Sequence, residues 1–127
     1  MPNGCVFVFD IDNTITPNKR EANRILQHVN SYDIPTIFNT SRLKLWRRIG
    51  LGKHFSIPED TIYYRSHISK TKSKLRNLYN ICTDFNVRPS DVHVFDNSCR
   101  MLQTIGAYGF NTHCVNPKTG IQFNNVH

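Results

Sequence analysis

The chain has few cysteines and no long apolar run, and each shortage excludes a class of protein. Among 127 residues there are four cysteines, and no two of them form a C-x-x-C pair; they are Cys5, Cys82, Cys99 and Cys114. This spacing argues against a disulfide framework and against a zinc ribbon, so free thiols are expected. The longest apolar run, at 6–9, is far too short to span a bilayer, and no membrane association is expected.

The N-terminal stretch "MPNGCVF" lacks the basic region and the long apolar region of a secretory signal. We therefore expect an intracellular protein, cytoplasmic or nuclear. The length is within the usual size of one folding unit, so residues 1–127 are expected to form a single domain with one core.

Acidic residues are scarce relative to basic ones. The sequence has 9 Asp and Glu against 16 Lys and Arg, which gives a net charge of +7. An excess of this size favours an anionic partner or substrate, although it can also serve solubility alone.

Apolar runs alternate with segments of helical spacing along the chain. Strands are expected at 5–9, 34–38, 60–66, 91–98 and 112–115, the last followed by a polar tail. Helices are expected at 18–31, 43–49, about 72–85 and 101–105. This alternation predicts an α/β three-layer sandwich with a mainly parallel, Rossmann-like sheet of about five strands.

Polar residues follow three of the expected strands, at the edge where α/β sheets bind ligands. They are Asp10 and Asp12, Thr40 and Ser41, and Asp96 and Asn97. Because side chains alternate along a strand, Asp10 and Asp12 are expected to share one small space, where a hard divalent cation such as Mg²⁺ would relieve their repulsion. Taken alone, D-x-D-x-T is also a common turn sequence.

These residues together resemble the haloacid dehalogenase (HAD) superfamily of aspartate-dependent phosphohydrolases, over most of the chain. "VFVFDIDNT" matches its first motif, and "TIFNTSR" matches its second. Lys72, 24 positions before Asp96, matches the third motif, and "VHVFDNS" matches the fourth with Asn97 in place of the second acid. This Asp-Asn pair is similar to that of the RNA polymerase C-terminal-domain phosphatases, and it implies weaker magnesium binding than two acids would give.

The resemblance implies a phosphomonoesterase that works through an aspartyl-phosphate. Asp10 would be the nucleophile and Asp12 the general acid and base, while Thr40 and Lys72 would stabilise the transferred phosphoryl group. Magnesium would be held by Asp10, Asp12, Asp96 and Asn97, and substrate would be bound by Thr40, Ser41, Arg42 and Lys72.

Two of these assignments have rivals nearby in the sequence. Lys74 is the second choice for the catalytic lysine, and Lys70 also belongs to the basic run "SKTKSK". Ser41 is the rival of Thr40, which we prefer from strand register.

The segments after Thr14 and after Ser66 are too short for an inserted cap domain, so the chain resembles the capless class, whose open sites admit large substrates. Phosphoproteins and nucleic-acid ends are therefore expected as substrates. Four basic residues are expected to ring the mouth of the site: Arg42, Lys44, Lys70 and Lys74. The alternative function is a non-catalytic module that binds anions or nucleic acid on the same fold.

Overall fold

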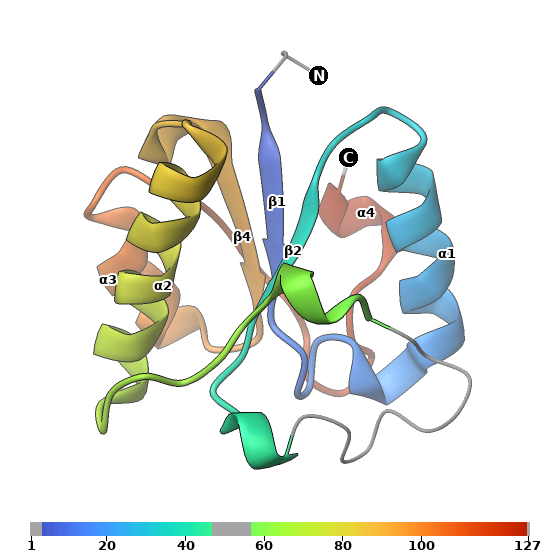
Figure 1. Ribbon diagram of the computed structural model, residues 1–127. Helices are drawn as coiled ribbons and strands as arrows, with labels where there is room; N and C mark the ends of the chain where they lie inside the picture. The colour runs from blue at the N-terminus through green and yellow to red at the C-terminus, as the bar shows by residue number, and fades with distance from the viewer. Residues whose placement is uncertain (1–3, 47–56, 127) are drawn as a thin grey trace.

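The computed structural model describes residues 4–46 and 57–126, which form a five-stranded sheet with helices on both faces (Figure 1). The strand order is β3-β2-β1-β4-β5, and every pairing is parallel. The strands are β1 (Val6–Phe9), β2 (Thr36–Asn39), β3 (Ile62–Tyr63), β4 (Val92–Asp96) and β5 (Asn111–Cys114). The helices are α1 (Lys19–Asn30), α2 (Lys70–Phe85), α3 (Cys99–Gly106) and α4 (Phe123–Val126). The predicted fold class is confirmed.

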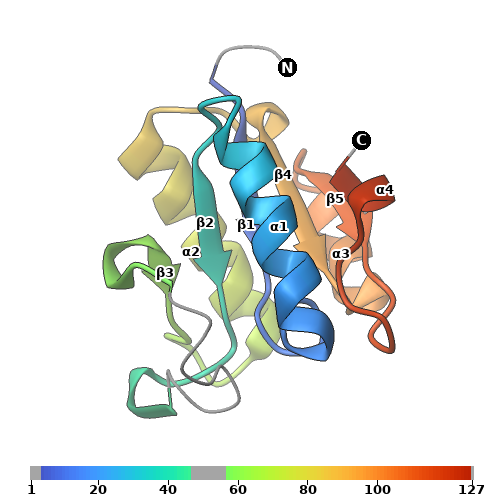
Figure 2. The ribbon, with the colours of Figure 1, turned by 90° about the vertical axis from the view of Figure 1, so that its right-hand side faces the viewer.

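Alternation along the buried strands divides the core between the two faces of the sheet. Phe7 and Phe9 point toward α1, whereas Val6 and Val8 point toward α2 and α3. Figures 1 and 2 show α1 and α4 covering one face and α2 and α3 covering the other. Both faces of β1 are therefore buried, as expected for a central parallel strand.

Side-chain caps start the three long helices near the carboxyl ends of the strands. Asn18, Ser69 and Ser98 each accept a hydrogen bond from the backbone N–H three residues later. Helix α2 thus begins at Lys70, two residues before the expected start.

Three segments differ from the sequence-based expectation. Strand β3 is only two residues long. The expected helix at 43–49 is a 3₁₀ turn over Lys44–Trp46 that does not include Leu43, and 47–49 lie outside the described residues. The expected polar tail instead folds onto the α1 side of the sheet, where Ile121 is buried and α4 packs nearby. The three apolar residues of this segment, Ile121, Phe123 and Val126, stand among polar ones and gave no periodic signal in the sequence.

The expectation of four free thiols is wrong, because Cys99 and Cys114 form a disulfide with a Cα–Cα distance of 5.3 Å. Cys114 lies beside Asp96 in the register of β4 and β5, and Cys99 begins α3 just after Asp96. The fold therefore brings together two residues whose spacing of 15 gave no sign of pairing. Such bonds are rare in reducing compartments. Cys5 and Cys82 are free and buried.

The connections from β1 to α1 and from β3 to α2 contain no cap domain in the part of the chain that the structure describes. Within the same part, no helix combines the length and apolar character needed to cross a membrane.

Candidate active site

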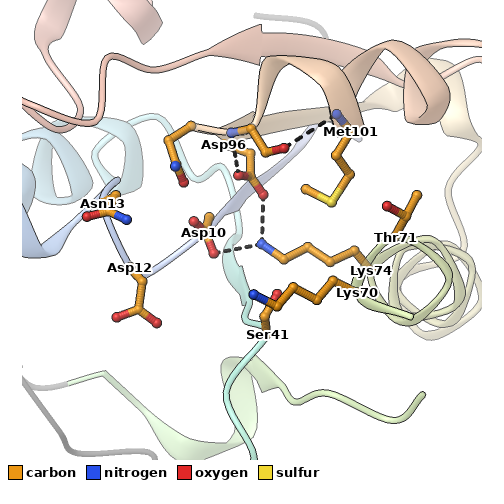
Figure 3. A pocket seen from close by; sticks show the side chains of 11 residues that line it. Asp10, Asp12, Asn13, Ser41, Lys70, Thr71, Lys74, Asp96 and Met101 are labelled. Carbon is orange, nitrogen blue, oxygen red and sulfur yellow. Dashed lines mark hydrogen bonds and ion pairs between the residues drawn. The ribbon is translucent and has the colours of Figure 1, made fainter. Parts of the chain in front are cut away.

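A buried lysine joins the carboxylates at the ends of the two central strands. Lys74 Nζ donates to Asp10 Oδ1 at 2.6 Å and to Asp96 Oδ2 at 2.7 Å, and all three side chains are at most 8% exposed. Figure 3 shows Lys74 reaching from α2 to lie between the two acids. Because buried charges are tolerated when they are paired and hydrogen-bonded, this arrangement fixes the positions of all three groups.

The pKa values of Asp10 and Lys74 are perturbed by burial and by their charged neighbours. Burial raises the pKa of Asp10 from 3.8 to about 6, because the attraction of Lys74 only partly offsets burial and the charge of Asp96 adds to it. Burial alone would lower the pKa of Lys74, but the two carboxylates outweigh it, so its pKa is raised. Asp10 therefore resists ionisation, while Lys74 keeps its positive charge.

The oxygens of the same carboxylates that do not contact Lys74 converge on a second point, although Asp96 Oδ1 also accepts from Ser98 N at 3.0 Å. With its amide nitrogen turned inward, Asn97 donates to Asp10 Oδ2 at 2.9 Å, to the Asp12 carbonyl at 3.2 Å and to Asp96 Oδ1 at 3.3 Å. Each carboxylate thus uses one oxygen for Lys74 and the other for this point. These three oxygen atoms surround the amide nitrogen of Asn97 in the way that they would surround a small cation.

This donor set fits magnesium. Two carboxylates and a backbone carbonyl supply oxygen, and a half-turn of the Asn97 amide adds a fourth, which matches the preference of Mg²⁺ for few protein oxygens and several waters. Across residues 4–46 and 57–126, no three His, Cys, Asp or Glu side chains gather around one point. The expected ligands Asp10, Asp96 and Asn97 do come together, but Asp12 contributes its backbone rather than its side chain.

The side chain of Asp12 pairs with an arginine instead of crowding Asp10. Arg42 Nε and Nη2 donate to the two carboxylate oxygens of Asp12 at 2.9 and 2.7 Å. The Asp12 side chain is 53% exposed, and in Figure 3 it points away from Asp10 and Lys74. The expectation that Asp10 and Asp12 share one space is wrong, because β1 ends at Phe9 and the chain turns through Asn13 at φ 61°. Strand alternation ends with β1 and therefore does not reach Asp12.

The segment after β5 supports the loop that carries Asp10 and Asp12. Ile121 N donates to the carbonyl of Thr14 at 2.7 Å. Gly120 has φ +72°, and a Cβ built there would lie 2.8 Å from the same carbonyl oxygen. Only glycine permits this close approach.

An open pocket of about 370 Å³ lies over these groups. Its lining comes from the loop after β1, from Ser41, from the first turns of α2 and from the start of α3; the residues include Asn13, Lys70, Thr71, Ser98 and Met101. Besides the acids, Lys74 and Asn97 already described, only Ser41 and Lys70 in this lining were named from the sequence as candidate site residues.

The structure places Lys74, and not the expected Lys72, between the acids. Lys72 is exposed on α2 and is not part of the pocket lining. Ser73, Lys74 and Leu78 lie on the buried face of α2, and Lys72 lies on the outer side. The spacing of four between Lys74 and the apolar Leu78 was a signal for this choice.

Thr40 does not line the pocket, in contrast to its expected role. It is fully buried, its backbone N–H still pairs with β3, and its hydroxyl accepts from Arg42 N at 3.0 Å. Ser41 is half-buried and faces the pocket. The register of β2 continues one residue further than expected, which turns Thr40 inward.

The basic residues expected to ring the site divide into two kinds. Lys70 lines the pocket, and Lys44 is exposed in the 3₁₀ turn after β2. Arg42 and Lys74 are instead bound to Asp12 and to the buried acids, so they do not ring the mouth.

A buried amide pair that was not selected from the sequence holds α2 against β2. Asn39 Nδ2 donates to the carbonyl of Lys74 at 3.0 Å, and Asn77 Nδ2 donates to Asn39 Oδ1 and to the Tyr64 carbonyl at 3.0 and 2.9 Å. These bonds hold α2 in place at Lys74, the candidate catalytic residue. Polar residues on the inner face of a helix were the available signal.

A scan against protein-family models found no match, and a search of curated proteins likewise found none.

Proposed function

We propose that the chain is a magnesium-dependent phosphomonoester hydrolase of the haloacid dehalogenase type. One observation carries this proposal: Lys74 bridges Asp10 and Asp96, and the remaining oxygens of both acids converge with the Asp12 carbonyl and the Asn97 amide. An ion pair with a purely structural role would not need this second cluster of oxygen atoms. Hydrolysis of a phosphate ester through an aspartyl-phosphate needs both a cation and a fixed carboxylate nucleophile.

In this proposal Asp10 attacks phosphorus, forming an Asp10–O–P bond while the ester P–O bond breaks. Asp12 gives a proton to the leaving oxygen and later takes one from the water that splits the aspartyl-phosphate. Lys74 stabilises the negative charge that develops on the phosphoryl oxygens, and Ser41 donates a hydrogen bond to one of them. Bound magnesium would neutralise phosphate charge as Asp10 approaches.

Asp12 must move to act as the acid. Its carboxylate is held by Arg42 and points away from Asp10, so a rotation about its side-chain torsions has to accompany substrate binding. An incoming phosphate competes for the Arg42 guanidinium, because arginine binds both anions through the same fork of donors.

The alternative is a non-catalytic module that binds anions, and the outward position of Asp12 favours it. Hydrolysis of a small phosphate monoester, measured with magnesium and with a chelator, distinguishes the two. We expect turnover that depends on magnesium and is lost by about a hundredfold or more in Asp10→Asn. Equal rates for the wild-type protein and the variant would reject the proposal.

A further inference from the structure

The charges of the protein are separated along the strand direction. Six basic residues that we call the basic rim lie in first helical turns or in loops at the carboxyl edge of the sheet: Arg20, Lys44, Lys70, Lys72, Arg100 and Lys118. The loop of Lys118 belongs to this edge because Ile121, just after it, bonds to Thr14. In Figure 1 this edge is the lower one, where α1 and α2 begin.

Acidic residues outside the site lie elsewhere. Asp33, Asp84 and Asp91 are found at the opposite edge, before β2, at the end of α2 and before β4, and Glu59 and Asp60 precede the outer strand β3. At the carboxyl edge, the described part of the chain has one acid besides the site residues: Glu21, which is paired with Arg24 at 3.2 Å. The rim is thus nearly free of competing negative charge.

From this separation we infer that the site acts on the phosphorylated end of a nucleic-acid strand, an inference that rests on the proposed function. The basic rim comes from several elements on different sides of the pocket, so a strand leaving the pocket over α1 or over α2 meets cations in either direction. Nucleic acid carries one negative charge per nucleotide and no positive charge.

A phosphoprotein fits this edge less well. Its own lysines and arginines would be repelled by the basic rim, and the exposed carboxylate there, Asp12, is already paired with Arg42. Two exposed apolar side chains at the same edge, Leu45 at 86% and Ile68 at 91%, would lie against sugars and bases of the strand. Contacts of these kinds do not read sequence, so binding should depend on charge and length more than on base order.

Binding is best measured with Asp10→Asn protein, because that variant does not consume the probe. The probes are fluorescent single-stranded DNA oligonucleotides of about 4 and about 16 nucleotides with a 5′- or 3′-phosphate, followed by anisotropy. We expect tighter binding of the longer probe and a log–log salt slope of about −2 to −3, as for three or four phosphate contacts. A phosphopeptide of equal net charge should bind at least about tenfold more weakly, since it lacks the condensed counterions of a nucleic acid.

Charge reversals identify the surface. Lys72→Glu and Arg100→Glu lie in first helical turns, where a negative charge favours the helix, so these variants should fold. Each should weaken binding of the long probe by about three- to tenfold. Arg88→Glu, the same charge change at the opposite edge, is the control and should leave binding unchanged.

The outcomes separate this inference from the proposed function. Hydrolysis of a small ester together with salt-independent binding, equal effects of all three reversals, or tighter binding of the phosphopeptide would overturn the nucleic-acid assignment alone. Rim-dependent binding of the long probe, with no turnover of any ester by wild-type protein, would overturn the hydrolase proposal alone.

Discussion

Replacing Asp10 with asparagine should stabilise the protein at neutral pH, although it removes the proposed nucleophile. The pKa of Asp10 is raised from 3.8 to about 6 in the folded protein. Between these values the folded state keeps a proton that the unfolded state has lost, so the free energy of unfolding falls as pH rises from about 4 to about 7. A difference of about two pKa units corresponds to about 3 kcal/mol at pH 7.

Urea unfolding in magnesium-free, chelated buffer at several pH values between about 4 and 8 measures this effect. We expect wild-type protein to lose about 3 kcal/mol over that range relative to Asp10→Asn, with the two proteins converging near pH 4. Asp60→Asn, which also removes one carboxylate but at an exposed position, controls for the change in net charge.

Added magnesium should narrow the gap at pH 7, because a cation at the oxygen cluster favours ionised Asp10. If wild-type stability is constant or rises between pH 4 and 7, or if Asp10→Asn is no more stable than wild type at pH 7, the assignment of Asp10 as a buried carboxyl with a raised pKa is wrong.

Three other substitutions have definite expected outcomes. Lys74→Met should destabilise the protein by about 3–5 kcal/mol, because it leaves two buried acids without their cation. The control Lys72→Met, at an exposed position, should cost less than about 0.5 kcal/mol, and equal costs of the two variants in urea titrations would reject the bridge. Asn97→Asp should tighten magnesium binding in calorimetry and lower the melting temperature without magnesium, and a loss of affinity would remove Asn97 from the metal site. Gly120→Ala should destabilise the fold by about 2–3 kcal/mol and its control, Gly109→Ala, by about 1 kcal/mol, since both glycines have positive φ but only a Cβ at 120 would meet a carbonyl oxygen. If Gly120→Ala costs no more than Gly109→Ala, the close approach to that carbonyl does not constrain the fold.

The features that were predictable from sequence are those with a local signal. Apolar runs that end in polar residues marked Asp10 and Asp96 correctly as neighbours at the carboxyl edge, because parallel strands place their ends together. Lys74 also had a local signal, because it lies four residues before the buried Leu78 and therefore shares its helix face, whereas Lys72 does not.

Contacts between distant segments were not predictable in the same way. The pairing of Arg42 with Asp12 depends on the turn at Asn13, whose backbone conformation no periodicity reveals. The burial of Ile121 likewise depends on a surface that exists only after the sheet and α1 have formed. Single residues of this kind carry too little pattern to be recognised before the fold is known.

The position of β1 at the centre of the sheet has a consequence for synthesis on the ribosome. Its neighbour β2 ends at Asn39, but its other neighbour β4 is complete only at Asp96, about 57 residues later. At a synthesis rate of about 5–20 residues per second, one edge of the apolar β1 remains unpaired for roughly 3–11 s after β2 is complete. An open, hydrophobic strand edge is a site for pairing with other chains, so nascent chains of this protein are most prone to aggregate in that interval.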